Sequence, residues 1–189
     1  MVSKVDHLDL EIIRLLQKDG RISVTELAEK VKSSRATVTN RLKRLIDEEL
    51  IMVRGGLNLQ KCGFKVAGVG LEVKKEPVRK EVEAYLKNCP RVMNLFRTPE
   101  KANIHVIVWG EDEHTINSTI ESFRDLQNVD IIYTHYLGTP IHGNIIINVE
   151  SENNVETPCG MKCANCYRYN NAWCLGCPAS KDYKNPLLK

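Results

Sequence analysis

Five cysteines near the C-terminal end of the chain have the spacing of a metal site. They lie within 19 residues, separated by segments of three, two, seven and two residues: Cys159, Cys163, Cys166, Cys174 and Cys177. The pairs at 163/166 and 174/177 are Cys-x-x-Cys knuckles, and together they supply the four thiolates that a tetrahedral zinc ion or a cubane iron–sulfur cluster requires. A segment this short has no core of its own, so bound metal would have to order it. We therefore predict a small metal-binding tail over residues 159–189.

Three kinds of chemistry suit these cysteines. Zinc is the first choice, and an iron–sulfur cluster is the second because Cys177-Pro178 resembles the end of bacterial ferredoxin motifs, although the seven-residue spacer departs from them. Thiol redox chemistry without metal is the third. Cys159 exceeds the four thiols of the knuckles and is predicted to be an alternative ligand, an exchange partner or a redox-sensitive thiol. Cys62 and Cys89 stand alone and are predicted to be ordinary thiols.

A second stretch with the residues for chemistry is basic. From Ser33 to Arg44 there are four basic residues and no acid, and apolar residues recur at helical spacing through Val38 and Leu45. The opposite face of such a helix carries small, amide and basic side chains, which can approach the major groove and hydrogen-bond base edges, while basic residues nearer its border suit phosphates. The predicted DNA contacts on this helix are Arg35, Ala36, Thr37, Asn40, Arg41, Lys43 and Arg44.

The elements around this basic helix form a helix-turn-helix in the sequence. Ser23 precedes Glu26 by three residues, which predicts a capping box and a helix from about Val24. An amphipathic helix ending near Lys18 precedes it. Two short apolar runs, 51–53 and 57–59, flank Arg54-Gly55-Gly56 and predict a small hairpin, or wing, with Arg54 placed at its tip to contact phosphate.

Residues 6–60 resemble the N-terminal domain of the Lrp/AsnC family of transcription regulators. The resemblance is carried by four segments: Leu8-Asp9 with Ile12–Leu16, Gly20–Ser23, Glu26–Ala28, and Ala36–Val38 with Arg41–Leu45. One departure is Ser33-Ser34-Arg35, where the family usually has a Leu-Ser-Pro type entry to the recognition helix. The resemblance implies a winged helix-turn-helix DNA-binding domain over residues 1–60, followed by a domain in which chains pair and small effectors bind.

The middle of the chain, residues 61–149, predicts that second domain from its own patterns. Strands are predicted over 64–73, 91–97, 103–109, 129–137 and 141–149, and helices over 77–88 and 111–126. The order β-α-β-β-α-β with one extra strand is that of a ferredoxin-like sandwich, so the fold class is α+β. The family's effector turn, commonly Gly-x-Tyr/Phe-Asp, corresponds here to residues 98–103, which lack its glycine and aromatic residue. The resemblance gives Thr98, Glu100 and Asn103 as candidate effector contacts.

Composition sets outer limits on the class of protein. The 189 residues are 42% hydrophobic and 27% charged, with a net charge of +3. No apolar run approaches the roughly 20 residues that span a bilayer, and the charged start lacks the core of a signal peptide. We expect a cytoplasmic protein with no membrane contact. Residues 150–158 are polar and are predicted to be a flexible linker.

These features predict a sequence-specific DNA-binding transcription regulator, not an enzyme. We expect it to bind double-stranded DNA as a homodimer or a larger assembly such as an octamer, and to respond to metal or redox state through its cysteines. The alternative is an architectural, nucleoid-like protein that binds DNA broadly and uses zinc only to fold its tail. A thiol-exchange enzyme is disfavoured, because nothing in the sequence supplies a substrate pocket or lowers a thiol pKa.

Overall fold

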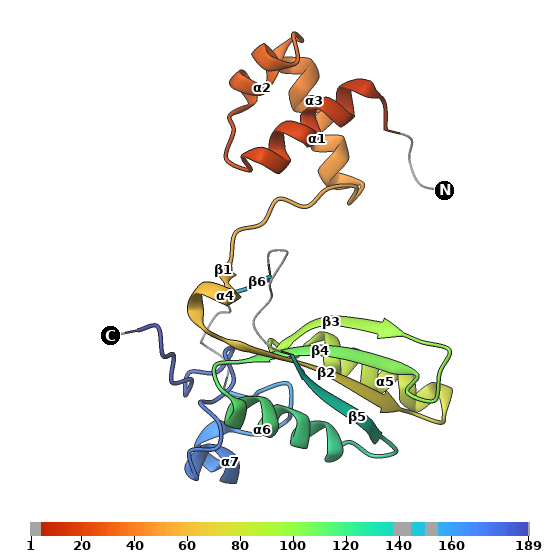
Figure 1. Ribbon diagram of the computed structural model, residues 1–189, viewed down its shortest axis with the longest axis vertical. Helices are drawn as coiled ribbons and strands as arrows, with labels where there is room; N and C mark the ends of the chain where they lie inside the picture. The colour runs from red at the N-terminus through yellow and green to blue at the C-terminus, as the bar shows by residue number, and fades with distance from the viewer. Residues whose placement is uncertain (1–4, 138–144, 150–154, 189) are drawn as a thin grey trace. The chain divides into compact units, whose positions relative to one another are not determined.

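The computed structural model describes residues 5–137, 145–149 and 155–188 (Figure 1). The chain forms two compact units, Met1–Gly55 and Gly56–Lys189. Residues 141–144 of the strand predicted over 141–149, and residues 150–154 of the linker predicted over 150–158, therefore lie outside the described residues. None of the described helices is long and apolar enough to cross a membrane.

The described part of the first unit, from residue 5 on, contains three helices around one small core. They are α1 (His7–Lys18), α2 (Val24–Lys30) and α3 (Arg35–Asp47). Ile12, Leu27 and Val38 come from the three helices in turn, and each is completely buried in the shared core. The Ser23 and Ser34 hydroxyls cap α2 and α3 by accepting hydrogen bonds from the third residue of each helix, at 3.1 and 3.0 Å. The predicted helix-turn-helix is thus confirmed.

The reciprocal capping box lies on a different helix from the one the sequence indicated. At α2 the Glu26 carboxylate contacts Lys30 Nζ at 2.9 Å, one helical turn on, instead of returning to the cap. At α1 both halves of the box are present: the Asp9 N–H donates to Asp6 Oδ1 at 2.9 Å, and the Asp6 N–H donates to Asp9 Oδ2 at 3.0 Å. This box fixes the Asp9 carboxylate at the start of α1.

The predicted hairpin between residues 51–53 and 57–59 is wrong. Strand β1 (Leu57–Asn58) pairs instead with β6 (Ile146–Ile147) in an antiparallel ladder, and Leu59 begins the short helix α4 (Leu59–Cys62). The physical reason is burial, because Leu59 and Ile147 pack with Phe64 and Trp109 in a core of the second unit. A return to 51–53 would leave these apolar side chains uncovered.

The second unit contains an antiparallel sheet of four strands, in the order β3-β4-β2-β5. Its elements in sequence are β2 (Lys65–Glu72), α5 (Glu76–Lys87), β3 (Val92–Arg97), β4 (Ile104–Gly110), α6 (Glu113–Arg124) and β5 (Asp130–Leu137). Val69 lies opposite Val106 on one side and Thr134 on the other. Leu86 of α5 and Phe123 of α6 pack on the same core as these valines, so both helices cover one face. The predicted ferredoxin-like sandwich is confirmed.

The tail packs against this sandwich, within the same compact unit. It contains a 3-10 turn, η1 (Cys163–Asn165), and a short helix, α7 (Tyr167–Asn170). The Arg91 side chain donates from Nη2 to the Gly176 carbonyl at 2.6 Å, and the Ser118 hydroxyl of α6 donates to the Trp173 carbonyl. The sequence presents the tail as a separate segment, but these contacts attach it to the turn just before β3 and to α6.

Candidate nucleic-acid interface and cysteine cavity

Helix α3 has an exposed face that matches much of the predicted DNA contact set. Ala36, Asn40 and Lys43 follow one another at spacings of four and three residues, and all three are exposed, as is Arg35 beside them. Thr37 is half-buried, and its hydroxyl lies 2.8 Å from that of the capping residue Ser34. The exposed face therefore combines an amide, two basic groups and a small residue, which is the combination that base edges and phosphates require.

One exposed residue on this face was missed from the sequence. Thr39 lies between the predicted contacts, and its hydroxyl donates to the Arg35 carbonyl at 2.8 Å. Thr39 is four residues before Lys43, so helical spacing alone places the two side chains together. Its methyl group and hydroxyl extend the surface that Asn40 and Lys43 present.

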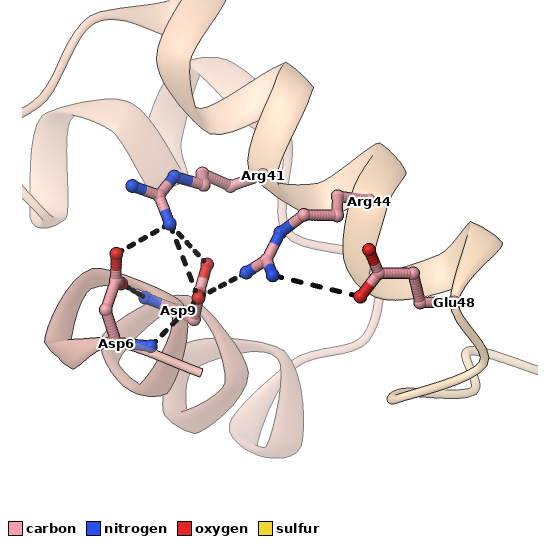
Figure 2. A network of polar contacts seen from close by, with 5 residues as sticks. All are labelled: Asp6, Asp9, Arg41, Arg44 and Glu48. Carbon is pink, nitrogen blue, oxygen red and sulfur yellow. Dashed lines mark hydrogen bonds and ion pairs between the residues drawn. The ribbon is translucent and has the colours of Figure 1, made fainter. Parts of the chain in front are cut away.

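Arg41 and Arg44, by contrast, take part in an ion-pair network inside the first unit (Figure 2). Arg41 Nη1 lies 2.6 Å from Asp6 Oδ2 and 3.4 Å from Asp9 Oδ1. Arg44 Nη2 lies 2.5 Å from Asp9 Oδ2, and its Nη1 lies 3.8 Å from Glu48. The Asp9 side chain is completely buried, whereas those of Arg41 and Arg44 are 35% and 31% exposed.

The hydrogen bonds of the network favour its charged forms. The backbone N–H of Asp9, together with the Arg41 guanidinium, holds the pKa of Asp6 below its ordinary value. The hydrogen bond to Asp9 raises the pKa of Arg44. The two arginines therefore connect α3 to the start of α1. A contact from Arg44 to a base would compete with its bond to the buried Asp9 carboxylate.

Arg54, the remaining predicted DNA contact, is exposed in the segment after α3.

Comparison with known proteins places this arrangement in a family. A family model described as a winged helix-turn-helix DNA-binding domain matches residues 5–52. The HTH-type transcriptional regulator Ptr1 of Methanocaldococcus jannaschii is 31% identical over 129 residues, which cover 67% of this chain and 86% of Ptr1. The chain belongs to the HTH-type transcriptional regulators. The prediction of a regulator instead of an enzyme is confirmed by these matches.

Solved structures show the fold that this regulator shares with Lrp-type proteins. LrpC of Bacillus subtilis has a TM-score of 0.59 and 23% identity, over 74% of this chain and 99% of LrpC. A transcriptional regulator from Neisseria meningitidis, crystallised with L-Met, has a TM-score of 0.65 and 20% identity, over 77% of this chain and 97% of its own. The chain thus shares its fold, over about three quarters of its length, with these structures.

The cysteines of this regulator gather around one cavity in the second unit. The cavity has a volume of about 80 Å³, and its walls include all five tail cysteines and one cysteine of the sandwich: Cys159, Cys163, Cys166, Cys174, Cys177 and Cys89. Cys163 is buried and Cys159 is exposed. The two knuckles predicted from spacing are therefore brought together with the fifth tail thiol, and Cys89 is an addition that the sequence did not indicate.

The chemistry of the donors fits a thiophilic metal, although the side chains are not a closed coordination shell. None of the cysteines is in a disulfide, and no three His, Cys, Asp or Glu side chains of the described part of the chain are grouped tightly enough to hold an ion. Burial raises the pKa of Cys174 and raises that of Cys177 to about 12. A metal would have to displace these protons, and the thiols would have to turn into the cavity they line.

The predicted effector turn is closed by its own hydrogen bonds. The Asn103 side chain accepts from the Val73 N–H at 3.1 Å and donates to the Val73 carbonyl at 3.0 Å. The Thr98 N–H donates to the Asn103 carbonyl at 3.1 Å, and the Thr98 hydroxyl donates to the Ala102 carbonyl. Glu100 is exposed at the turn. Asn103 therefore fixes the start of β4 to the end of β2.

Proposed function

We propose that this regulator binds double-stranded DNA sequence-specifically through α3. The observation that carries the proposal is the exposed face of Ala36, Asn40 and Lys43 on a helix whose other face is fixed in a helix-turn-helix. Asn40 can bond an adenine edge in bidentate fashion, and Lys43 and Arg35 can reach phosphates. The network around Asp9 supports the same role, because it holds the helix in one orientation before DNA arrives.

The proposed binding unit is a homodimer, which can assemble further into an octamer. A two-fold dimer presents two copies of α3, and the half-sites of a pseudo-palindromic operator are then one DNA turn apart, roughly 34 to 36 Å. The net charge of only +3 limits non-specific attraction to DNA. Base contacts therefore have to supply much of the discrimination.

Selection of binding sites from a random DNA pool by the full chain tests this proposal. We expect a single pseudo-palindromic motif, bound at least about a thousandfold more tightly than random DNA at fixed salt. Sedimentation of the protein–DNA complex gives the number of chains per site. A pool without an enriched motif, bound at uniform affinity, contradicts the proposal and supports the architectural alternative, in which the cysteines only fold the tail.

The second part of the proposal is that the cysteine cavity adjusts DNA binding in response to metal or redox state. Its support is the number and variety of the thiols: the knuckles alone supply four, and Cys159 adds an exposed fifth that is open to exchange or oxidation. Zinc is the first candidate and an iron–sulfur cluster the second. When bound, such a centre supplies the free energy that orders the cysteine segment.

Operator affinity measured against added zinc, chelator and oxidant tests this second part. The full chain is compared with a double variant, Cys163→Ser with Cys174→Ser, which removes one thiol from each knuckle. We expect the unmodified chain to change its affinity and the double variant to be insensitive. Constant affinity of the unmodified chain, with metal demonstrably bound, means that the site is structural only.

An amino-acid effector is the competing regulatory input. The neighbouring Neisseria structure is of a complex with L-Met. In this chain the Asn103 side chain, at the position given by the resemblance, is already bonded twice to Val73. The same affinity measurement, repeated with single amino acids, separates the two inputs.

A further inference from the structure

Cys89 lies at a rigid position of the sandwich that faces the tail. It follows the last turn of α5, where its N–H donates to the Leu86 carbonyl at 3.1 Å. Its own carbonyl accepts from the Val92 N–H at 3.0 Å, so the backbone is fixed on both sides just before β3. A thiol on such a turn has little freedom to lose when it binds a ligand, in contrast to thiols on the short tail segment.

Cys89 lines the same cavity as the tail thiols. Five cysteines of the tail reach this cavity, although the sequence separates Cys89 from them by 70 residues or more: Cys159, Cys163, Cys166, Cys174 and Cys177. The cavity therefore brings thiols of the sandwich and of the tail around one space.

The cavity between these thiols has room for an ion, although their side chains would have to turn inward to hold it, because no three ligating side chains of the described residues are grouped tightly enough. Its volume of about 80 Å³ exceeds the roughly 10 to 15 Å³ that one water-sized sphere occupies, so an ion and the sulfurs turned toward it have room. Arg91, which is almost completely buried and pairs with Glu111 at 2.8 Å, lines the same cavity. A centre with several thiolates carries net negative charge, which the nearby guanidinium partly offsets.

We propose that Cys89 is a ligand of a thiolate metal centre in this cavity, so that the metal links the tail directly to the turn between α5 and β3. The inference rests on the proposed metal binding by the tail cysteines and adds to them one thiol from the sandwich. In this arrangement Cys159, the exposed thiol, is left as the exchangeable one.

Zinc binding by the full chain, measured in competition with a chromophoric chelator, tests the proposal. We expect Cys89→Ser to weaken zinc binding by more than about tenfold, since even outer-shell changes at metal sites cost 10- to 100-fold. The matched control is Cys62→Ser, because Cys62 is similarly half-buried but packs in the separate core around Leu59 and Trp109. The same pair of variants, reconstituted anaerobically with iron and sulfide, distinguishes a cluster from zinc.

A second measurement uses the unmodified chain, in case Cys89→Ser does not fold. Alkylation with and without zinc, followed by peptide mass analysis, should show metal-dependent protection of Cys89 together with the knuckle cysteines, and no change at Cys62. Undiminished metal binding by a folded Cys89→Ser, or equal alkylation of Cys89 with and without metal, overturns the proposal. Metal binding that needs Cys89 but leaves operator affinity unchanged instead contradicts only the proposed regulation.

Discussion

Two buried carboxylates, one in each unit, hold arginines for different purposes. Asp9 in the helical unit pairs with Arg44 and Arg41, whose side chains remain about a third exposed. Glu111 in the sandwich unit pairs with Arg91 at 2.8 Å, and both side chains are almost completely buried. The first pair orients a helix whose neighbouring face stays open, and the second fastens the tail. The role of an arginine is therefore decided by its partner and its burial, not by its place in a basic stretch.

The largest effect is expected from removing the fully buried pair. Glu111→Ala leaves Arg91 charged and buried, and it also removes the acceptor of the Tyr183 hydroxyl. Loss of one partner of a buried pair costs about 3 to 5 kcal/mol, so the free energy of unfolding of the second unit should fall by that amount. Urea denaturation measures it. The control is Glu121→Gln, whose exposed pair with Arg124 should contribute less than about 1 kcal/mol. Similar losses in both variants would show that Glu111 is solvated.

A smaller effect is expected from the half-exposed network in the helical unit. Asp9→Asn keeps the size of the side chain but removes the charge that faces Arg41 and Arg44. We expect a loss of about 2 kcal/mol in the free energy of unfolding of the first unit, since the arginines can regain water. Glu11→Gln, on the exposed side of the same helix, is the control. An unchanged free energy of unfolding in Asp9→Asn would mean that the packing of α3 does not depend on this network.

The sequence predicted the helices and strands better than it predicted which distant residues contact one another. Hydrophobic periodicity reports which face of a helix or strand is buried, so the helix-turn-helix and the sandwich could be predicted. The partner of Arg44 is 35 residues away, and no local pattern connects Arg44 with Asp9. Cys89 has no neighbouring cysteine to give a spacing, so its place beside the tail could not be inferred. The segment 57–59 was misplaced because a short apolar run does not indicate which strand will cover it.

A still smaller change is expected at an exposed cation of α3. Lys43→Ala should weaken binding to the operator and to random DNA about equally, because a phosphate contact carries no sequence information. The dependence of log affinity on log salt should become shallower by about 0.9. Fluorescence anisotropy titrations at several salt concentrations measure both quantities. A selective loss on the operator would instead assign Lys43 to a base.

The smallest effect concerns the acid stability of the sandwich. The Arg97 guanidinium, bonded to Glu83 at 2.5 and 2.7 Å, holds the pKa of Glu83 below its ordinary value of 4.5. A carboxyl with a lowered folded pKa contributes stability above that ordinary value and loses it as the pH falls through the folded pKa. Arg97→Gln should therefore lessen the fall in unfolding free energy below about pH 4.5. The difference is small, because the Arg97 side chain is 58% exposed. Parallel profiles of unfolding free energy against pH for the unmodified chain and Arg97→Gln would contradict this prediction.

The most direct test of the division of labour on α3 is to measure operator discrimination and stability together for Asn40→Ala and Arg44→Ala. Asn40→Ala should lose about 1 to 3 kcal/mol of preference for the operator over random DNA, with an unchanged free energy of unfolding. Arg44→Ala should lower the stability of the first unit, because it leaves Asp9 buried with one partner fewer. This division of labour is contradicted if Asn40→Ala keeps its full preference for the operator over random DNA. It is also contradicted if Arg44→Ala loses that preference while its free energy of unfolding is unchanged.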